Sequence, residues 1–592
     1  MSELGVFNDG DFRRIEAIPR RPIATDAEVA HYQRVLTDHL KTPHGTWVLK
    51  PKQAECLTEF LKTGTLWGRV GAGGGKTLLG FLIGTVAVEQ FQCKRILILV
   101  PAALREKTFD DHTDLKANWR LLPLLAHDDP ASGPHIRVLS YETFSTAGFA
   151  AYLDEYQPDV VIADEAHAFA RLKSGRTKRL FRYLRNARKA GRKVYFVPMS
   201  GTFERKSYKD SAHIAEGALG DYSPLPQEYN QLEQWTLAVG EGVSDEQRIG
   251  FGALLRLCTD DEANQGINGV RRAINRRILE APGVVASTKL ECDLPLILQH
   301  RHVVVPPEVK TAMDRLRREY MLPGDIPVEA GVAFWSHARE VAAGFAYKWD
   351  PEAPWEWKAA RSAWVKFVNE ALKSSKIDTP LQVWNAVESG AWGDVPEFHA
   401  WRDIRHTFKP RTKPIWISDY LVRDAEAWAK ETGGIVWVGH TSAYKVDDAE
   451  DDESTVGAMF RDIPFFAGGD ERIKTYRGPC AASIRSHGTG KNLTQWDEAL
   501  IMTMPSSGKT LEQLLARHHR EKQQADLVRF WFYAHSLENA NALDTALADA
   551  RFLQDGGGAP QRALHASILG ADGKNYRRDA FEDLTDPMWW SE

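Results

Sequence analysis

Cysteine is scarce in this chain, with five residues in 592, and no two of them form a C-x2-C pair. Zinc ribbons need cysteine pairs at such short spacing, and small secreted domains need a dense set of cysteines for their disulfides. The sequence therefore predicts neither kind of domain. A reducing compartment, the cytoplasm, is the expected location.

Long hydrophobic runs are also missing. A membrane-spanning helix takes about 20 consecutive apolar residues, and no run of even about 18 occurs in this sequence. The first five residues, M-S-E-L-G, are mostly polar and include an early acidic residue, which is not typical of a secretion signal. We predict neither membrane insertion nor secretion.

The chain has no overall excess of positive charge, since 75 Lys and Arg face 80 Asp and Glu and the formal net charge is −5. Any nucleic-acid binding must therefore come from a local patch. One candidate is the segment 171–193, which contains eleven Lys or Arg and no Asp or Glu. Arg179, Arg182 and Arg185 recur every three residues, so part of this charge lies on one helical face. A phosphate backbone as partner and an ordinary solvated surface explain the patch equally well.

The sequence does contain a glycine-rich loop at residues 70–77, V-G-A-G-G-G-K-T, between the short run 65–67 and the apolar helical pattern 78–88. A strand, a glycine loop and Lys-Thr at the start of a helix together wrap backbone N–H groups around a triphosphate. The strict pattern G-x4-G-K-[ST] asks for glycine at Val70, so a merely flexible glycine loop is an alternative for this segment taken alone.

Each part of the loop has an expected contact with ATP. The glycines let the backbone approach the phosphates where a Cβ would collide. Lys76 is expected to reach the β- and γ-phosphates, and the Thr77 hydroxyl to hold Mg²⁺. Gln53, earlier in the chain, could pair with adenine because its amide is both donor and acceptor, although a surface glutamine explains it as well. The expected nucleotide-binding residues of this region are Gln53, Gly73, Gly74, Gly75, Lys76 and Thr77.

Four apolar runs after the loop, at 95–100, 136–141, 160–163 and 194–197, predict strands buried on both faces of a parallel sheet. Helical stretches separate these runs, so we expect βαβ units in a doubly wound sheet. In such a sheet the chemistry gathers at the carboxyl ends of the strands. The residues that follow each run are therefore the candidates for catalysis.

The sequence D-E-A-H, residues 164–167, directly follows the run 160–163. Asp164 at a strand end can hold Mg²⁺ through water, and Glu165 is placed to orient and deprotonate an attacking water. An acidic helix N-terminus would explain one carboxylate but not the whole motif. We therefore predict a hydrolytic acid pair.

Small hydroxyl residues follow the run 194–197, in the sequence S-G-T at 200–202. Such residues could couple the nucleotide site to a neighbouring surface, although an ordinary turn explains them equally well. The expected coupling residues of this region are His167, Ser200, Gly201 and Thr202.

The composition changes beyond this first sheet. Residues 205–295 look helical, loop-rich and charged, and eleven of the nineteen tryptophans lie between Trp335 and Trp437. The tryptophans could form stacking platforms for bases or, as is more usual, the core of a small helical insert. The runs 294–298 and 301–305 read as short strands that close the first sheet or open a second one.

A second sheet is predicted from the buried run 434–440 and from the later runs 480–484 and 498–502. The helix expected from Thr510 carries four polar residues spaced by 4, 3 and 3, which would place all of them on one face. Its two arginines could reach a γ-phosphate bound by the other lobe, whereas a solvated helix is the simpler alternative. The four residues are Gln513, Arg517, Arg520 and Gln523.

Taken in order, these segments resemble a superfamily-two helicase core, and most closely the Swi/Snf-type branch of DNA-translocating ATPases. D-E-A-H and the glycine loop are widely shared, whereas G-x-G-x-N-L at 488–493 followed by Q-x3-R-x2-R-x2-Q is more specific to the branch. The resemblance spans about residues 49–530 and departs at Val70, at Lys491 and in the Trp-rich segment. The matching residues are Gln53, 73–77, Val100-Pro101, 164–167, 200–202, 488–493 and the four polar residues of the later helix.

The resemblance implies an α/β fold with two RecA-like parallel-sheet lobes, helical insertions between them, and ATP with Mg²⁺ in the cleft. It implies catalytic roles for Lys76, Asp164, Glu165, Arg517 and Arg520, nucleotide contacts for Gly490 and Gln513, and coupling through Asn492. The implied domains are a lead-in at 1–45, a first lobe at 46–300 with a helical insertion at about 205–295, a Trp-rich insert at 301–430, a second lobe at 431–550, and a linker with tail at 551–592.

The predicted activity is therefore ATP-dependent translocation on nucleic acid, with DNA favoured over RNA, in a bacterial or phage-infected cytoplasm. A protein partner could bind through the Trp-rich insert or the C-terminal tail. Two alternatives stay open. A viral terminase-like packaging ATPase would need a nuclease domain, for which residues 531–592 look too short, and a nucleotide-switched nucleic-acid clamp would show little turnover.

Overall fold

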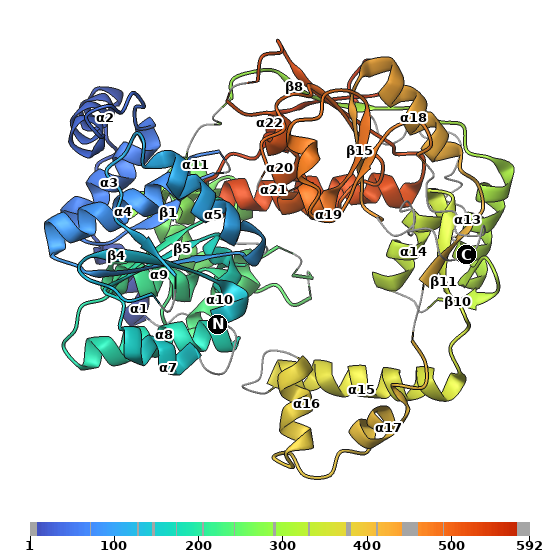
Figure 1. The fold of residues 1–592 in the computed structure, drawn as a ribbon, viewed down its shortest axis with the longest axis horizontal. Helices are drawn as coiled ribbons and strands as arrows, with labels where there is room; N and C mark the ends of the chain where they lie inside the picture. Colours follow the sequence, from blue (N-terminus) through green and yellow to red (C-terminus); the bar gives the residue numbers. More distant parts are fainter. Residues whose placement is uncertain are drawn as a thin grey trace. The chain divides into compact units, whose positions relative to one another are not determined.

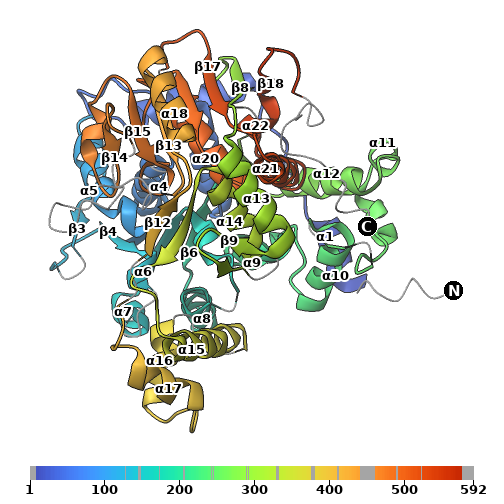
Figure 2. The same cartoon turned by 90° about the vertical axis from the view of Figure 1, so that its right-hand side faces the viewer.

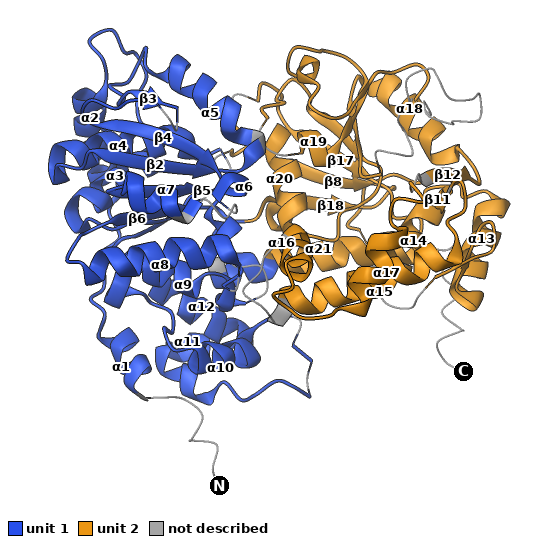
Figure 3. Ribbon diagram, turned by 60° about the horizontal axis from the view of Figure 1, so that its bottom comes forward, with its two compact units in different colours: residues 1–290, 375–379, 551–560 blue, residues 291–374, 380–550, 561–592 orange. Residues whose placement is uncertain are grey.

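The computed structural model contains two compact units (Figures 1 and 3). Unit 1 comprises the described residues up to 290 together with 551–560, and unit 2 comprises the other described residues. Within the described part of the chain, no helix combines the length and the apolar composition needed to cross a membrane. The structure describes residues 9–71, 73–126, 129–144, 149–172, 174–203, 207–241, 243–244, 246–287, 290, 292–328, 332–374, 380–409, 412–440, 460–488, 491–521 and 523–576.

Unit 1 is built on a seven-stranded, wholly parallel sheet with the order β3-β4-β2-β5-β6-β1-β7. The predicted run 95–100 is a strand with those limits, and the other predicted strands shift by up to two residues. The strands are β1 Trp67–Arg69, β2 Arg95–Val100, β3 Leu124–Leu125, β4 His135–Ser140, β5 Val160–Asp164, β6 Tyr195–Met199 and β7 Val284–Ala286.

Helices cover both faces of this sheet. Capping fixes where some of them begin: Thr25 and Glu28 form a capping box ahead of α2, and Pro51 occupies the first turn of α3. The α-helices of unit 1 are α1 Asp9–Ala17, α2 Asp26–Leu40, α3 Pro51–Thr63, α4 Lys76–Phe91, α5 Ala102–Leu115, α6 Tyr141–Phe144, α7 Phe149–Tyr156, α8 Gly175–Lys189, α9 Ala212–Leu219, α10 Tyr229–Val239, α11 Asp260–Ala263 and α12 Gly266–Leu279; short 3-10 helices are η1 Ala166–Phe169, η2 Tyr208–Asp210, η3 Gly220–Tyr222 and η4 Gly252–Leu257.

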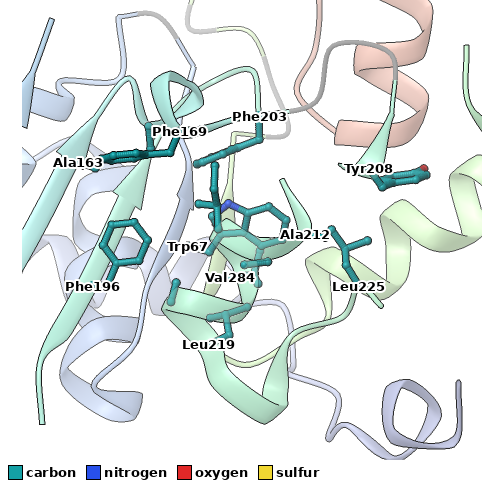
Figure 4. Close-up of a cluster of buried hydrophobic side chains, with 14 of the residues drawn as sticks. Trp67, Ala163, Phe169, Phe196, Phe203, Tyr208, Ala212, Leu219, Leu225 and Val284 are labelled. Carbon is teal, nitrogen blue, oxygen red and sulfur yellow. The ribbon is translucent and has the colours of Figure 1, made fainter. Parts of the chain in front are cut away.

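The sheet of unit 1 separates two hydrophobic cores. Along β2, Leu97 and Leu99 belong to one core, while Ile96 and Ile98 belong to the other. Side chains alternate along a strand, so an unbroken apolar run supplies both faces. Figure 4 shows part of the first core around Trp67, which packs edge-on against Phe203 with ring centroids 5.4 Å apart.

Unit 2 holds a second parallel sheet of seven strands, in the order β14-β15-β13-β16-β17-β8-β18. The run 294–298 therefore opens the second sheet, as β8 Leu296–His300, whereas 301–305 forms no strand. The predicted fold class, α/β with two RecA-like parallel-sheet lobes, is confirmed. The remaining strands are β13 Ile435–Val438, β14 Phe465–Phe466, β15 Cys480–Ser483, β16 Glu498–Ile501, β17 Val528–Phe532 and β18 Ser567–Leu569.

Between β8 and β13 lie most of the tryptophans. The rings of Trp357 and Trp401 lie 5.0 Å apart, and those of Trp364 and Trp384 lie 5.7 Å apart, inside the group α15, α16 and α17 (Figure 2). These rings form a small helical core, whereas Trp355 is 73% exposed. The elements here are α13 Pro307–Glu319, β9 Met321–Leu322, β10 Ile326–Pro327, α14 Val332–Ala342, β11 Phe345–Trp349, α15 Trp355–Ser374, α16 Pro380–Glu388, α17 Pro396–Ile404, β12 Thr412–Trp416 and α18 Tyr420–Thr432.

Two helices near the end of the chain differ from the sequence-based expectation. The helix expected from Thr510 begins earlier, because Ser507 is the N-cap and accepts a hydrogen bond from the backbone N–H of Thr510. The segment from Asp555 to Gly557, expected to be a linker, continues a helix. The last helices are the 3-10 turn η6 Glu471–Lys474, α19 Ile484–His487, α20 Gly508–His518, α21 Leu537–Gly557 and α22 Arg562–His565.

Candidate active site

The glycine loop lies between β1 and α4 in unit 1. Gly75 caps α4 in the left-handed conformation, with φ of +69°. A Cβ on Gly75 would lie 2.4 Å from Nε2 of Gln53, which is closer than any real contact. Gly74 donates its backbone N–H to the carbonyl of Gly71 at 3.3 Å. The left-handed backbone therefore favours glycine at position 75, and a side chain there would also have to displace the amide of Gln53.

The side chain of Gln53 holds the glycine loop through hydrogen bonds. Its Nε2 donates to the carbonyl of Gly75 at 3.0 Å, and its Oε1 accepts from the backbone N–H of Lys50 at 2.8 Å. The Lys50 ammonium donates to the carbonyl of Gly73 at 2.8 Å. Each end of the Gln53 amide thus makes one hydrogen bond to the chain itself.

The double constraint on Gly75 gives a testable prediction. Gly75→Ala is expected to lower the free energy of unfolding by more than about 1 kcal/mol, because the new methyl group adds a clash to the strain of a left-handed backbone. The matched control is Gly191→Ala, where φ is +71° but a Cβ would meet nothing within 4 Å. Chemical unfolding of both variants measures the difference, and equal losses in the two variants would contradict the close contact with Gln53.

Lys76, the first residue of α4, reaches back over the loop. Its ammonium donates to the carbonyls of Val70 at 3.3 Å and Gly71 at 3.4 Å, and pairs with Oε1 of Glu165 at 3.2 Å. The Val70 side chain is buried in the core, so the loop uses only its carbonyl. Valine at position 70 is therefore compatible with the loop geometry. Thr77, next along α4, is half-buried.

Asp164 is the last residue of β5 and is buried. Its Oδ1 accepts from the backbone N–H of Glu165 at 2.9 Å, and its carbonyl accepts from the Tyr141 hydroxyl at 2.7 Å. Burial raises the pKa of Asp164 to about 6, with Lys76 opposing the shift and Glu165 adding to it. The surroundings of Asp164 therefore balance only part of its negative charge, and such a carboxylate is suited to bind a cation.

Glu165 links the loop to the S-G-T segment. Its backbone is left-handed, with φ of +55°, an uncommon conformation for a non-glycine residue. One carboxylate oxygen pairs with Lys76, and the other lies 3.2 Å from Nδ1 of His167. That nitrogen also lies 3.1 Å from the Ser200 hydroxyl. Lys76, Glu165, His167 and Ser200 thus form one continuous polar chain.

The rest of the S-G-T segment adjoins this chain. The backbone N–H of Thr202 donates to Oγ of Ser200 at 3.2 Å. A Cβ on Gly201 would lie 3.0 Å from Cα of Gly71, so the segment touches the glycine loop. The structure therefore brings the expected coupling residues of unit 1 next to the loop and the acid pair.

Two residues that support the loop had no signal in the sequence. Ser287 follows β7 and accepts a hydrogen bond from the backbone N–H of Gly71 at 3.2 Å. Lys50 holds the carbonyl of Gly73. Ser287 lies more than 200 residues beyond the loop and belongs to no recognisable motif, and strand pairing of β7 with β1 is what brings it there.

In unit 2, two arginines converge on one backbone carbonyl. Arg517 on α20 donates from Nε to the carbonyl of Gln513 at 2.9 Å and from Nη1 to that of Lys491 at 2.8 Å. Arg520 donates from Nη1 to the same Lys491 carbonyl at 3.4 Å. Asn492 is exposed beside them, and Gly490 lies outside the described residues.

The expectation of four polar residues on one helical face is wrong. α20 ends at His518, so Arg520 and Gln523 follow the helix rather than continue it. The chain turns back instead, and Nε2 of Gln523 donates to the carbonyls of Trp496 at 3.2 Å and His518 at 3.3 Å. The physical reason lies at His519, the C-cap, whose ring Nε2 lies 2.7 Å from the carbonyl of Leu294.

His518 anchors this region and was not predicted. Its Nε2 accepts from the indole N–H of Trp437 at 3.1 Å, and its Nδ1 lies 2.9 Å from the carbonyl of Leu493. An indole N–H can only donate, so Nε2 accepts and Nδ1 carries the proton. Burial lowers the pKa of His518 to about 4, which keeps the ring neutral.

Acid is therefore expected to destabilise unit 2. Burial lowers the pKa of His518 and His535 to about 4, and the same holds for His300 and His487. Below about pH 6.5 the unfolded chain takes up protons there that the folded unit does not, so stability falls towards pH 4, by at most about 1.4 kcal/mol per histidine per pH unit.

The test compares wild type with His518→Gln by urea unfolding at pH 7.5 and pH 5. Burial raises the pKa of the half-buried Glu498 and of the buried Glu512, which therefore titrate in the opposite sense, so the difference between the two proteins is the informative quantity. We expect the variant to be less stable at pH 7.5 and to lose less on acidification. Parallel losses in the two proteins would contradict the neutral His518.

The sequence matches no protein-family model and no curated protein sequence. Among solved structures, the chain is similar to the Sulfolobus solfataricus SWI2/SNF2 ATPase core in complex with dsDNA, with 14% sequence identity and a TM-score of 0.32, over 87% of this chain and 95% of that chain. A likeness at this identity and TM-score establishes no shared activity.

Proposed function

We propose that this chain is an ATPase that couples ATP hydrolysis to movement on nucleic acid, as a translocase or helicase. The observation that carries the proposal is the polar chain of Lys76, Glu165, His167 and Ser200, which starts at a glycine loop and ends at the S-G-T segment. A merely flexible loop would not need a lysine shared between loop carbonyls and a catalytic-type carboxylate.

The proposed binding step uses groups that are already placed around the loop. Backbone N–H groups of 73–75 and the start of α4 face the phosphates, and Lys76 exchanges the carbonyls of Val70 and Gly71 for phosphate oxygens. The ammonium loses little in this exchange, because phosphate oxygens carry more negative charge than carbonyls. Glu165 is then released from its ion pair with Lys76.

Mg²⁺ fits the donor set that Thr77 and Asp164 offer. Mg²⁺ is usually bound by one or two protein groups together with substrate phosphates. When bound, it neutralises charge on the phosphate oxygens. Burial raises the pKa of the Asp164 carboxylate, and a nearby cation would offset the cost of its buried charge.

Glu165 is proposed as the general base. Once Lys76 turns to phosphate, one oxygen of Glu165 is available to a water molecule, while His167 holds the other. The same His167 contacts Ser200, so a change at Glu165 on hydrolysis would alter the S-G-T segment. This connection is the proposed route from the chemistry to movement on nucleic acid.

Arg517 and Arg520 are proposed to complete the site from unit 2. Guanidinium groups stabilise the charge that spreads over the γ-phosphate oxygens as the bond breaks. Both arginines hold the Lys491 carbonyl, next to Asn492, so their movement would reach that segment. Gln513 lies one turn before Arg517, and its carbonyl orients the Arg517 guanidinium.

DNA is the preferred partner in this proposal, in a cytoplasmic setting, and the exposed Trp355 of the insert is a candidate contact for a protein partner. The experiment compares ATP hydrolysis with single-stranded DNA, duplex DNA and RNA, together with strand-displacement and triplex-displacement assays. Duplex stimulation with triplex displacement and no unwinding would support duplex translocation. ATP hydrolysis that none of the three nucleic acids stimulates would contradict the coupling.

A further inference from the structure

Helix α8 belongs to unit 1 (Figure 3), and its exposed face is basic. Its inner face, including Leu180 and Tyr183, is buried in the core. Its outer face is exposed and carries four cations, namely Arg182, Arg185, Arg188 and Lys189.

These four cations have no carboxylate partner within ion-pair distance among the described residues. Other cations of the same segment are used structurally: Arg179 donates to the carbonyl of Phe144 at 3.3 Å, and Arg192 donates to the Tyr183 hydroxyl at 2.6 Å. Glu216 interacts electrostatically with Arg185 and Arg188, but burial raises its pKa and so disfavours its charge.

The basic face continues into two cavities. The first, of about 370 Å³, is lined by Arg188, Arg192 and Lys193. The second, of about 1200 Å³, shares Lys193 with it and is also lined by Lys94 and Arg137. Arg188 of α8 lines the first cavity, and Lys193 lines both cavities. The outer face of α8 and the two cavities therefore form one continuous basic surface.

The larger cavity has an excess of positive charge, because four Lys or Arg side chains line it together with two carboxylates, those of Glu155 and Asp159. Asp159 pairs with Arg95 at 3.4 Å. Arg137 instead lies over the ring of Tyr156 at 4.6 Å, and Lys193 over that of Tyr195 at 4.5 Å. Aromatic rings hold these cations in place without cancelling their charge.

This surface lies away from the glycine loop. Lys94 and Lys193 come just before β2 and β6, at the amino ends of these strands. Lys76 and Asp164 come at the carboxyl ends of the same parallel sheet. The basic surface and the glycine loop therefore lie at opposite ends of the strands of this sheet.

We propose that this basic surface binds the phosphate backbone of a polynucleotide, as a second nucleic-acid contact of unit 1 remote from the ATP site. The inference rests on the proposed function for the identity of the polyanion. The four cations of α8 extend over about 10 Å of helix, a length along which duplex DNA presents about six phosphate charges. Arginine forks match phosphate oxygens, and uncompensated charge in an acidic chain calls for a polyanion.

The test is a variant in which Gln, a good helix former, replaces the four exposed cations of α8. Fluorescence anisotropy of a labelled DNA gives the binding constant between about 50 and 200 mM salt. We expect the variant to bind at least about tenfold more weakly. The magnitude of the slope of log K against log salt concentration, here called the salt slope, is expected to fall by about two to four. The variant is Arg182→Gln, Arg185→Gln, Arg188→Gln and Lys189→Gln.

Two further variants of the chain make the test independent of the folding of α8. Lys94→Gln with Lys193→Gln, at the cavity, is expected to lower the slope by about one to two. The matched control removes four exposed cations from the insert helices and is expected to keep the wild-type slope. The control is Lys358→Gln, Arg361→Gln, Lys366→Gln and Arg402→Gln.

The outcomes separate the two proposals. If wild type binds DNA and both basic-surface variants keep its affinity and slope, the second contact is overturned and the proposed function stands. If wild type binds no nucleic acid, both fall. Polyglutamate competing as well as DNA of equal charge would overturn the polynucleotide in favour of an acidic protein.

Discussion

Glu165→Gln is expected to reduce ATP hydrolysis by at least about a hundredfold while ATP still binds. Glutamine keeps the shape of the side chain and can still contact His167, but it cannot take a proton from water. It also removes the partner of Lys76, which frees the ammonium for phosphate. Steady-state hydrolysis and titration with a fluorescent ATP analogue measure the two effects separately.

The matched control is Glu89→Gln, near the far end of α4, where Glu89 contacts His39 and Arg120. This change removes one carboxylate charge, as Glu165→Gln does, but leaves the loop untouched, so near wild-type hydrolysis is expected. Wild-type hydrolysis by the Glu165 variant would exclude Glu165 as the base. Loss of ATP binding in that variant would instead assign Glu165 a structural role.

The second large effect is expected at Arg520. Arg520→Ala should lower kcat by about a thousandfold and leave ATP binding nearly unchanged, because an arginine of this kind acts on the charge of the transition state. Arg517→Ala should differ, since Arg517 is buried and its guanidinium also holds the Gln513 and Lys491 carbonyls. We expect that variant to lose both turnover and stability of unit 2.

Two controls sharpen this prediction. Arg520→Lys keeps the charge but not the planar fork, so partial recovery of kcat is expected. Arg477→Ala removes an exposed arginine of unit 2 that donates to nearby carbonyls, and hydrolysis should be unaffected. Undiminished nucleic-acid-stimulated hydrolysis by Arg520→Ala would exclude the proposed role of Arg520.

The sequence predicted most of the longer strands, because they are parallel and buried on both faces, whereas β17 and the short strands β3, β7, β14 and β18 were not predicted. In β2, the unbroken run 95–100 supplies two cores at once, and a short apolar run that ends at a proline is typical of such a strand. The motif residues were predictable for a related reason. Asp164 and Ser200 lie at the ends of neighbouring strands β5 and β6, and the carboxyl ends of parallel strands meet at one edge.

Contacts set by tertiary packing could not be predicted. Spacing placed Arg520 on the helix of Arg517, but α20 ends at His518, because the ring of the C-cap His519 contacts the carbonyl of Leu294. Glycines at 556–557 suggested a linker, yet they continue α21. Glycine propensity is a weak signal that the packing of a long helix overrides.

The most direct test of the proposed function is Mg²⁺-dependent ATP hydrolysis by the wild-type chain, with and without DNA, beside the Glu165→Gln variant. We expect hydrolysis by wild type that DNA accelerates, and its loss in the variant at unchanged ATP binding. Hydrolysis by wild type no faster than by the variant, with or without DNA, would contradict the proposal.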